Sequence, residues 1–364
     1  MNKADIIIIG AGVIGCSAAY ELAKRGYSVA LLDKGEAGKE ASSAAAGLLG
    51  VQAEWEKYDP LFDMARESRA LFPKQSAELM EASGIDIGYE EKGIYKIAET
   101  PKKMERLRET ALWQKEAGEE AIELSASELI QRERHFSHEL SGAVYYRKDG
   151  HVHAPELTKA YLHAAIHHGA ELFEYTAAEK ILSAAGKTEG VQTSKGNFYS
   201  KAVIVTAGAW STPLLTNFKD YKTFPVKGEM ISLKTSAPLL KAPVFQHGFY
   251  IVPKREGRIL VGATMKSDDW SKQVSAQSIY WLLEKAKSIL PDIASASFEA
   301  AWAGLRPEAQ QGSPYMEQHK EIKGLFVSAG HFRNGILLSP AAGKYIADLA
   351  EKRLAKEDDH ASLH

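Results

Sequence analysis

The chain has 364 residues, of which 45% are hydrophobic and 25% are charged, and its formal net charge is −2. That length is typical of two globular domains, and the apolar content excludes a disordered chain. The small net charge gives no indication of a nucleic-acid partner, because such a partner favours a basic face. No internal repeat is visible, so a solenoid is not expected.

The single cysteine and the lack of a long apolar run bear on location. Cys16 has no second cysteine with which to form an internal disulfide, so nothing indicates an oxidising compartment. No run of about 18 apolar residues occurs, so we expect neither a transmembrane helix nor a membrane partner. The uncharged stretch 6–20 after Lys3 resembles a signal peptide, but Asp5 and the glycines within the stretch argue against that interpretation. We therefore expect a cytoplasmic protein.

The first elements along the chain predict a β-α-β unit. Residues 4–9 form a short, isoleucine-rich run, as in a strand buried on both faces of a parallel sheet. A glycine turn and a helical pattern to Arg25 follow, and Gly26 stands where a C-cap glycine is expected. Residues 28–33 then predict a second strand. A β-α-β unit of about 30 residues is typical of the opening of a dinucleotide-binding fold.

The remaining elements divide into two kinds. Helices are expected over residues 63–83, 155–168 and 340–354, and buried strands over 201–207 and 325–328. The charged region 102–134 predicts a pair of surface helices whose charges face solvent. Between residues 224 and 266 the pattern changes to short alternating strands, which indicates an antiparallel sheet.

The order of these elements predicts an α/β chain, α+β overall, with a discontinuous nucleotide-binding domain and an antiparallel-sheet substrate domain. Parallel-type elements lie at both ends and in the middle of the chain, and the antiparallel elements lie between them. We expect the nucleotide-binding domain to comprise residues 1–87, 150–223 and 303–364. The substrate domain is then expected to comprise residues 88–149 and 224–302.

A G-x-G-x-x-G pattern follows the first predicted strand. Gly10 permits a tight turn, Gly12 lets the backbone approach a pyrophosphate, and Gly15 lets the helix pack close to the strand. The helix N-terminus supplies unpaired N–H groups and a partial positive charge for phosphates. Asp33, at the end of the second strand, is placed to accept hydrogen bonds from ribose hydroxyls, and an acid there disfavours NADP. This pattern does not distinguish FAD from NAD.

A second motif is the run of small residues from Ser42 to Leu49. Small side chains allow the backbone to approach a flat ring system or a phosphate, but they also suit a tightly packed helix or loop. The residues alone leave both interpretations open.

Further segments, together with this run, carry a resemblance to a known family. They are Val205–Ser211, Pro225–Glu229, Tyr250–Pro253, Val261–Met265, Trp302–Pro307 and Ala329–Pro340. Over essentially its whole length, the chain resembles the D-amino-acid oxidase/sarcosine oxidase group of FAD-dependent oxidoreductases. Within that group it is most similar to the glycine oxidases of thiamine biosynthesis.

The resemblance implies a fold, a cofactor and a reaction. The fold is a Rossmann-like FAD-binding domain of the glutathione-reductase type, with an antiparallel substrate sheet over the flavin. The substrate, glycine or another small amine such as sarcosine or a D-amino acid, loses hydride to the flavin. The resulting imine hydrolyses to the oxo acid, which is glyoxylate for glycine, and the electrons pass to molecular oxygen as hydrogen peroxide. A homo-oligomer, specifically a tetramer, and a role in thiazole synthesis are also implied.

Four residues match the family's catalytic set, three of them in the substrate pocket and one near the flavin. Arg306 matches the arginine that binds the substrate carboxylate, because a guanidinium fork pairs bidentately with a planar anion. Tyr250 matches a tyrosine whose hydroxyl helps to hold that carboxylate, and Met265 matches a position in the pocket wall. Arg333 lies in the segment that resembles the flavin-contacting turn, whose N–H groups would stabilise reduced flavin. By residue type alone, a surface arginine, a cross-strand aromatic residue or a core methionine is also expected at such positions.

The cofactor-binding residues implied by the motifs and the resemblance come from five segments. They are Gly10, Gly12, Val13, Ile14 and Gly15; Asp33 and Lys34; Ser42, Ser43, Ala45, Ala46, Gly47 and Leu48; Ala207, Gly208 and Trp210; and Gly330, His331, Arg333, Asn334, Gly335 and Ile336. We expect the FAD to be bound non-covalently. Cys16 is predicted to lie in the first helix by the adenine end, and the run 42–47 contains no histidine.

Histidines bear on two further expectations. The relatives carry a histidine two residues before the tyrosine, whereas this chain has Gly248 there with His247 adjacent, which leaves the fine shape of the pocket open. The pairs His151/His153 and His163/His167 hint at metal binding, but no cysteine or carboxylate completes a zinc pattern, so no metal is expected.

Other functions remain open at this stage. A sarcosine oxidase, or a D-amino-acid dehydrogenase that passes electrons to a carrier, would share the same motifs. Oxygen consumption with peroxide release distinguishes an oxidase from a dehydrogenase. A non-catalytic flavoprotein subunit is a different class, and turnover of glycine by the purified protein alone would exclude it.

Overall fold

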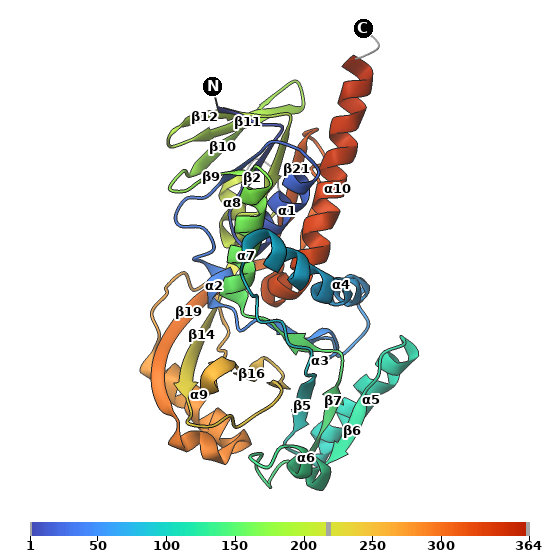
Figure 1. Ribbon diagram of the computed structural model, residues 1–364, viewed down its shortest axis with the longest axis vertical. Coiled ribbons are helices and arrows are strands. Elements are labelled where there is room, and N and C mark those ends of the chain that lie inside the picture. The colour runs from blue at the N-terminus through green and yellow to red at the C-terminus, as the bar shows by residue number, and fades with distance from the viewer. Residues whose placement is uncertain (1, 216–219, 362–364) are drawn as a thin grey trace.

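The computed structural model describes residues 2–215 and 220–361, and it consists of two bodies stacked along the long axis of the molecule (Figure 1). The upper body in Figure 1 contains both ends of the chain and is built around a six-stranded sheet. The lower body is built around a nine-stranded sheet. The chain crosses between the two bodies several times, so each contains segments that are distant in sequence.

The six-stranded sheet is parallel except at one edge. Its order is β20 (Tyr315–Gln318), β21 (Leu325–Ala329), β13 (Ala202–Val205), β2 (Ile6–Ile9), β3 (Val29–Leu32) and β9 (Glu171–Phe173), and only β20 is antiparallel to its neighbour. Ile6 and Ile8 contribute to one hydrophobic core, and Ile7 and Ile9 contribute to another on the opposite face. Burial on both faces explains why this strand is an unbroken row of isoleucines rather than an alternating pattern.

Four helices form the core on one face of this sheet. They are α1 (Val13–Lys24), α4 (Pro60–Ser83), α7 (Ala154–His167) and α10 (Gly335–Ala361). The other face is covered by a small sheet that the sequence patterns did not predict, in the order β1 (Asn2–Lys3), β12 (Gly196–Tyr199), β11 (Lys187–Thr193) and β10 (Ala178–Ala184). Its strands are rich in polar residues and bury few side chains, such as Val191 and Phe198, so their apolar signal is weak.

The nine-stranded sheet dominates the lower body. Its order is β18 (Lys266–Ser267), β14 (Thr223–Lys234), β17 (Arg258–Gly262), β16 (Phe249–Pro253), β15 (Val244–Gln246), β5 (Ile94–Ala98), β7 (Gly142–Tyr146) and β6 (Ile122–Ser125), with β19 (Ser297–Ala309) paired along β14. The expected antiparallel arrangement holds except between β5 and β15, which are parallel. No hairpin joins these two strands, so connectivity does not fix their relative direction.

Short elements connect the two bodies. They are α2 (Ala41–Ala44), α3 (Val51–Glu54), α8 (Ser211–Leu214) and the two-stranded ribbon of β4 (Leu48–Leu49) and β8 (Gly150–His151). The helices of the lower body are α5 (Pro101–Glu116), α6 (Ala126–Arg132) and α9 (Ala276–Ile289). The prediction of a helix pair over 102–134 is therefore wrong in part, because β6 lies between α5 and α6. Leu124 is the side chain that anchors β6 in the core of the lower body, and one apolar anchor in a charged region gives little sequence signal.

The last helix begins earlier than expected, at Gly335 rather than at Pro340. Pro340 lacks an N–H group and would leave a carbonyl of the preceding turn without its helical partner. The Ser339 hydroxyl donates to the Ile336 carbonyl at 2.9 Å, and the Ser68 hydroxyl donates to the Leu337 carbonyl at 2.7 Å. These bonds satisfy the first turn and allow the helix to extend through the proline.

The predicted domain division is not resolved by the element order alone, because β19 runs through the boundary predicted at residues 302 and 303. The division therefore remains a prediction.

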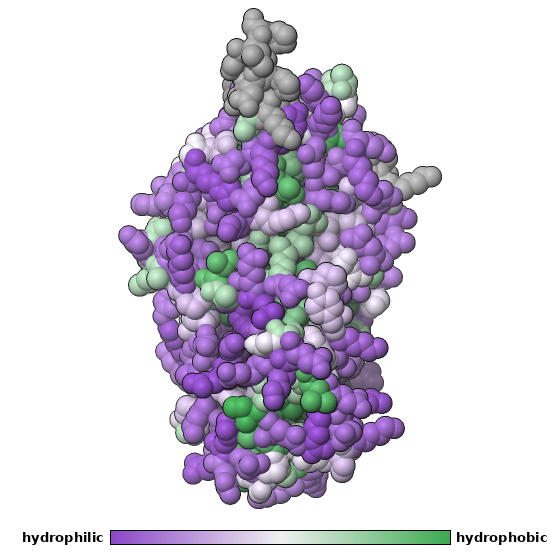
Figure 2. All heavy atoms as spheres, turned by 90° about the vertical axis from the view of Figure 1, so that its right-hand side faces the viewer, coloured by the Kyte–Doolittle hydropathy of each residue, from purple (hydrophilic) through white to green (hydrophobic). Residues whose placement is uncertain are grey.

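Hydrophilic side chains cover most of the face at the right of Figure 1, and the hydrophobic ones form separate groups (Figure 2). Among the residues that the structure describes, no helix has the length and apolar content needed to cross a membrane.

Candidate cofactor and substrate site

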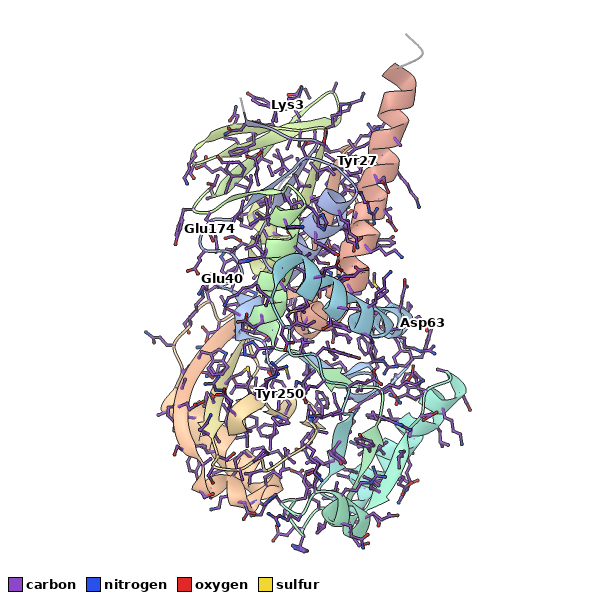
Figure 3. The ribbon with its side chains drawn as sticks, viewed as in Figure 1. Lys3, Tyr27, Glu40, Asp63, Glu174 and Tyr250 are labelled. Atoms are coloured by element: carbon purple, nitrogen blue, oxygen red, sulfur yellow. The ribbon has the colours of Figure 1, made fainter. Side chains whose placement is uncertain are left out.

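A cavity of about 610 Å³ lies between the two bodies. The upper body contributes the glycine turn, the end of β3, and residues 206–210 and 328–336, and the lower body contributes residues of β14, β16 and β19. Glu40 and Tyr250, both labelled in Figure 3, line the cavity from the junction and from the lower sheet, respectively. The sequence segments singled out above are thus brought together in one place.

The glycine turn is shaped by two close approaches. Gly10 adopts a positive φ of 104°, which an L side chain rarely tolerates. A Cβ on Gly15 would lie 1.9 Å from the Gly10 carbonyl oxygen, so only glycine allows α1 to begin this close to β2. The Ser42 hydroxyl accepts a hydrogen bond of 2.9 Å from the Val13 amide and ties the small-residue run to the start of the helix.

Asp33 fixes the adjoining loops. Its two carboxylate oxygens accept hydrogen bonds from the amides of Ala11 at 2.8 Å and Gly35 at 2.9 Å. Desolvation raises the pKa of Asp33, and these amide bonds oppose that shift. Each carboxylate oxygen can accept a second bond, so the side chain can still receive ribose hydroxyls from the cavity.

The opposite end of the cavity contains unpaired polar atoms. The Ser328 hydroxyl and His331 Nε2 are buried, line the cavity and have no hydrogen-bond partner among the described residues. Burial lowers the pKa of His331 to about 4, so its imidazole is neutral near pH 7. The first turn of α10, with Gly335 and Ile336, also lines this end and directs unpaired amides of a long helix toward it. These groups suit a ligand with a polar edge that can form hydrogen bonds with them.

Arg306 is the guanidinium best placed to bind an anion in this cavity. It projects from β19, its Nη1 donates to the Thr264 carbonyl at 3.2 Å, and no acidic side chain of the described residues pairs with it. A Cβ on Gly228 would lie 2.3 Å from Nη1, so glycine on the neighbouring strand makes room for this side chain.

Tyr250 lies on β16 with a largely buried ring. The only partner of its hydroxyl among the described residues is the Met230 sulfur at 3.5 Å, which is a weak acceptor. The hydroxyl is therefore available to a ligand in the cavity.

Arg333, by contrast, already has a partner that the sequence reasoning missed. Its Nε and Nη2 contact Glu54 Oε1 at 2.7 Å and Oε2 at 3.0 Å in a bidentate pair. Its guanidinium also lies 5.6 Å from the centre of the Phe245 ring. Only the position of Glu54 shortly after the small-residue run could have indicated its proximity to the site.

Three of the expected site residues do not line the cavity. Gly15 lies behind the turn, Ser43 faces a separate hollow beside Lys254, and Met265 is half exposed at the rim, with its sulfur 3.8 Å from Arg333 Nη1. All the other residues that the sequence analysis assigned to the cofactor or the substrate line the cavity.

The histidine neighbouring the tyrosine segment does not replace the family's histidine. His247 is 87% exposed in its side chain and contacts Glu56 at 3.7 Å, outside the cavity wall. Gly248 has a positive φ of 82°, and a Cβ there would lie 3.4 Å from Arg333 Nη1. That distance is an ordinary van der Waals contact, so it is the positive φ of the turn between β15 and β16 that favours glycine here.

Comparison with known proteins agrees with this geometry. A family model described as FAD dependent oxidoreductase matches residues 5–349. The chain belongs to the FAD-dependent oxidoreductase family. The glycine oxidase of Geobacillus kaustophilus (strain HTA426) is 42% identical over 97% of this chain and 94% of its own length, and that of Bacillus subtilis (strain 168) is 36% identical over 97% and 95%. The crystal structure of glycine oxidase from Bacillus cereus ATCC 14579 has a TM-score of 0.93 and 49% identity, covering 96% of this chain and 95% of that chain.

The cofactor of this FAD-dependent oxidoreductase is FAD, and the cavity walls fit it. The glycine turn and the start of α1 would hold the pyrophosphate, and Asp33, which lines the same end of the cavity, would accept hydrogen bonds from a ribose. The unpaired Ser328 hydroxyl and His331 nitrogen lie where the polar edge of a flavin could satisfy them. The fold class predicted from sequence, a Rossmann-like FAD-binding sheet joined to a largely antiparallel sheet, is confirmed.

Proposed function

We propose that this protein oxidises glycine and other small amines, including sarcosine and small D-amino acids, with molecular oxygen as the electron acceptor. The observation that carries the proposal is Arg306, a guanidinium without an acidic partner among the described residues, which lines the FAD cavity together with Tyr250. The names of the similar proteins, glycine oxidases at 36% to 42% identity, support the same substrate class.

The residues of the chain bind and orient the substrate. Arg306 holds the carboxylate through its planar fork, and the Tyr250 hydroxyl donates a further bond to the same anion. With the carboxylate fixed, the amine and Cα are directed toward the flavin end of the cavity, and orientation of this kind lowers the barrier to reaction. The neutral imidazole of His331 adds no competing positive charge there.

Bound in this cavity, FAD would supply the redox chemistry, namely acceptance of a hydride from the substrate Cα and transfer of the two electrons to oxygen. Glycine, oxygen and water thereby give glyoxylate, ammonia and hydrogen peroxide, through an imine that water hydrolyses. We further propose, on the family resemblance, that the imine supplies thiazole synthesis in thiamine biosynthesis.

The test is a steady-state panel of glycine, sarcosine, D-alanine and ethylamine with the purified holoenzyme. We expect oxygen consumption and stoichiometric peroxide with the amino acids and little turnover of ethylamine, which has no carboxylate for Arg306. Turnover only with an added electron carrier would favour the dehydrogenase alternative, and no turnover of any amine would favour the non-catalytic subunit.

The finer properties are part of the proposal. We propose non-covalent FAD, because Cys16 is wholly buried in α1 and its thiol donates to the Ala11 carbonyl at 3.3 Å. Acid precipitation should therefore release all the flavin into the supernatant, and flavin that stays with the pellet would refute this. A cytoplasmic location and a homo-oligomer, expected to be a tetramer, remain predictions to be tested by fractionation and light scattering.

A further inference from the structure

Glu54 is an acidic side chain in a cavity whose proposed substrate is an anion. It lines the cavity together with Arg306 and Arg333, and its carboxylate holds Arg333 through two contacts of 2.7 and 3.0 Å. Both members of the pair are largely withdrawn from solvent, with side-chain exposures of 20% for Glu54 and 16% for Arg333. Partial burial and bidentate geometry are the conditions under which an ion pair is well ordered. The proposed function by itself assigns Glu54 no role.

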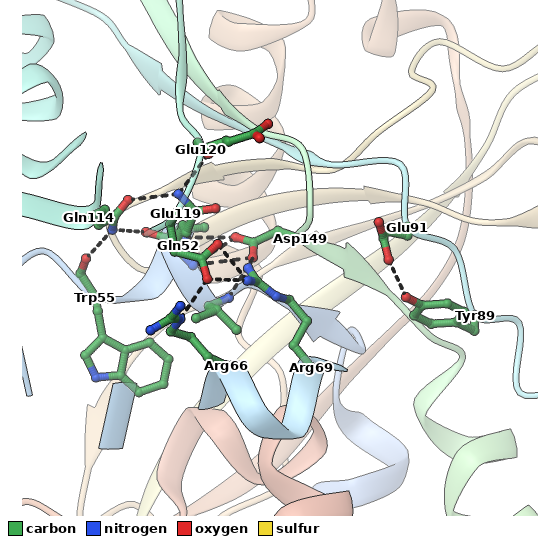
Figure 4. Close-up of polar contacts among 12 residues, drawn as sticks. Gln52, Trp55, Arg66, Arg69, Tyr89, Glu91, Gln114, Glu119, Glu120 and Asp149 are labelled. Carbon is green, nitrogen blue, oxygen red and sulfur yellow. Dashed lines mark hydrogen bonds and ion pairs between the residues drawn. The ribbon is translucent and has the colours of Figure 1, made fainter. Parts of the chain in front are cut away.

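A buried network holds Glu54 in place. Glu54 is the last residue of α3, and the Asp149 carboxylate accepts hydrogen bonds from the first amides of that helix, with Val51 at 3.1 Å, Gln52 at 3.0 Å and Ala53 at 3.1 Å (Figure 4). Asp149 is fully buried, and desolvation raises its pKa to about 6. The contacts with Arg69 favour the charged carboxylate and so oppose this rise in the pKa.

Arg69 completes this network. Its Nη1 contacts Asp149 at 2.7 Å, and its Nη2 contacts Glu119 at 2.7 Å (Figure 4). Because Asp149 fixes the start of α3 and Arg69 fixes Asp149, the end of α3 cannot move freely. Glu54 is therefore preorganised to hold Arg333 rather than recruited by chance at a mobile surface.

The two arginines of the cavity contact neighbouring residues of one short turn, but only one of them is paired with an acidic side chain. Arg306 Nη1 donates to the carbonyl of Thr264, and Arg333 Nη1 lies 3.8 Å from the sulfur of the next residue, Met265. Arg306 has no acidic partner among the described residues, whereas the charge of Arg333 is neutralised by Glu54. The cavity thus presents one guanidinium that can bind an anion and one that is already bound.

We propose that Glu54 is a specificity-determining residue that restricts the enzyme to amines with a single carboxylate. A substrate with a second anionic group beyond the amine would meet the Glu54 charge, and it would have to displace that carboxylate to reach Arg333. Repulsion between like charges in a partly desolvated site is an effective way to reject the wrong ligand. This inference rests on the proposed function, because it assumes that Arg306 holds the first carboxylate.

The first measurement is anion binding to the holoenzyme, followed by the change in flavin absorbance and independent of turnover. Acetate and malonate serve as probes with one and two carboxylates. In Glu54→Gln, which keeps the shape of the side chain and removes its charge, we expect malonate to bind at least about tenfold more tightly and acetate to change less than about twofold. Equal malonate affinity in wild type and variant would overturn the proposal.

Matched variants test whether the gain in malonate binding comes from the charge of Glu54 and from Arg333. Glu40→Gln removes another acid that lines the same cavity but pairs with Lys272 at 2.6 Å, and it should not change the malonate-to-acetate ratio. Glu54→Asp keeps the charge and should keep the discrimination. The double variant Glu54→Gln with Arg333→Gln should lose the gain, because the freed arginine is what binds the second carboxylate. A gain that persists in the double variant would contradict this role.

The second measurement compares substrates. The ratio of kcat/KM for iminodiacetate to that for glycine should rise at least about tenfold in Glu54→Gln, mainly through a lower KM for iminodiacetate. A purely structural role would lower both values together. If wild type fails to oxidise glycine, the proposed function is wrong, but the malonate and acetate measurement still decides the role of Glu54.

Discussion

The two ends of the FAD cavity are built in different ways. The nucleotide end is built around the stretch from Gly10 to Lys34, beside which residues 176–179 and 206–210 also line the cavity. It depends on backbone geometry, such as the Gly15 position where no Cβ fits. The substrate end depends on side chains from β16, β19, α3 and the turn before α10. Their positions are set by long-range pairing, as where Arg306 lies opposite Val226 across β14 and β19.

This difference predicts which property a substitution at each end should change. A change at the nucleotide end disturbs the backbone that holds the cofactor, so it should remove FAD and lower stability together. A change at the substrate end removes one side-chain contact, so it should leave FAD bound and alter kinetics. The following substitutions test that contrast, in order of decreasing expected effect.

The largest effect is expected for Gly15→Ala. The new Cβ would lie 1.9 Å from the Gly10 carbonyl, and relieving that clash requires α1 to move away from the glycine turn. We expect a destabilisation of roughly 4 kcal/mol, in the upper range for single substitutions, and loss of most bound FAD. Flavin absorbance per protein and thermal melting measure the two effects. Gly35→Ala is the control, because a Cβ on Gly35 would meet no atom within 4 Å.

Asp33→Ala should weaken FAD binding by about 1.5–3 kcal/mol, the range for a hydrogen bond to a charged group. The structure adds a second effect, because Asp33 also fixes the amides of Ala11 and Gly35. A modest fall in the melting temperature of the apoprotein should therefore accompany the higher dissociation constant. An unchanged dissociation constant would mean that Asp33 is not the ribose ligand.

Arg306→Lys should lower kcat/KM for glycine at least about tenfold, because an ammonium cannot reproduce the planar fork. Much of the loss should appear as a higher KM, with FAD content unchanged. Ethylamine turnover, poor in wild type, should be no poorer in the variant. Equal losses for amines with and without a carboxylate would contradict an anchoring role.

Arg333→Lys provides the comparison for Arg306. Because Glu54 already occupies the fork of Arg333, we expect a smaller effect on the KM for glycine than in Arg306→Lys. The reverse order of effects would move the carboxylate site to Arg333.

Tyr250→Phe should have the smallest effect. The hydroxyl has only the Met230 sulfur as a partner among the described residues, so its removal should cost little stability. Loss of one bond to the substrate carboxylate should raise the KM for glycine about two- to tenfold. Wild-type and variant melting curves should overlay, and a KM that does not change would exclude the hydroxyl from substrate binding.

Much of the fold could be predicted because its signals are local. The isoleucine run, the glycine turn and the alternating strands each reflect burial or backbone conformation within a few residues. The small sheet of β1, β10, β11 and β12 could not be predicted, because its polar strands bury too few side chains to leave a pattern. The parallel pair of β5 and β15 was missed because strand direction there depends on the whole chain path.

The sequence by itself determined the glycine turn and Asp33, because close backbone approach and charge leave signals at fixed short spacings. The other segments that line the cavity were indicated by the resemblance of the chain to a known family. Only the tertiary structure decided which arginine is available to a substrate. Arg306 and Arg333 have the same chemistry in sequence, and their difference arises from Glu54, which a capped short helix brings to Arg333 from 279 positions away. An ion pair between residues so distant in sequence depends on tertiary packing, so no local sequence pattern predicts it.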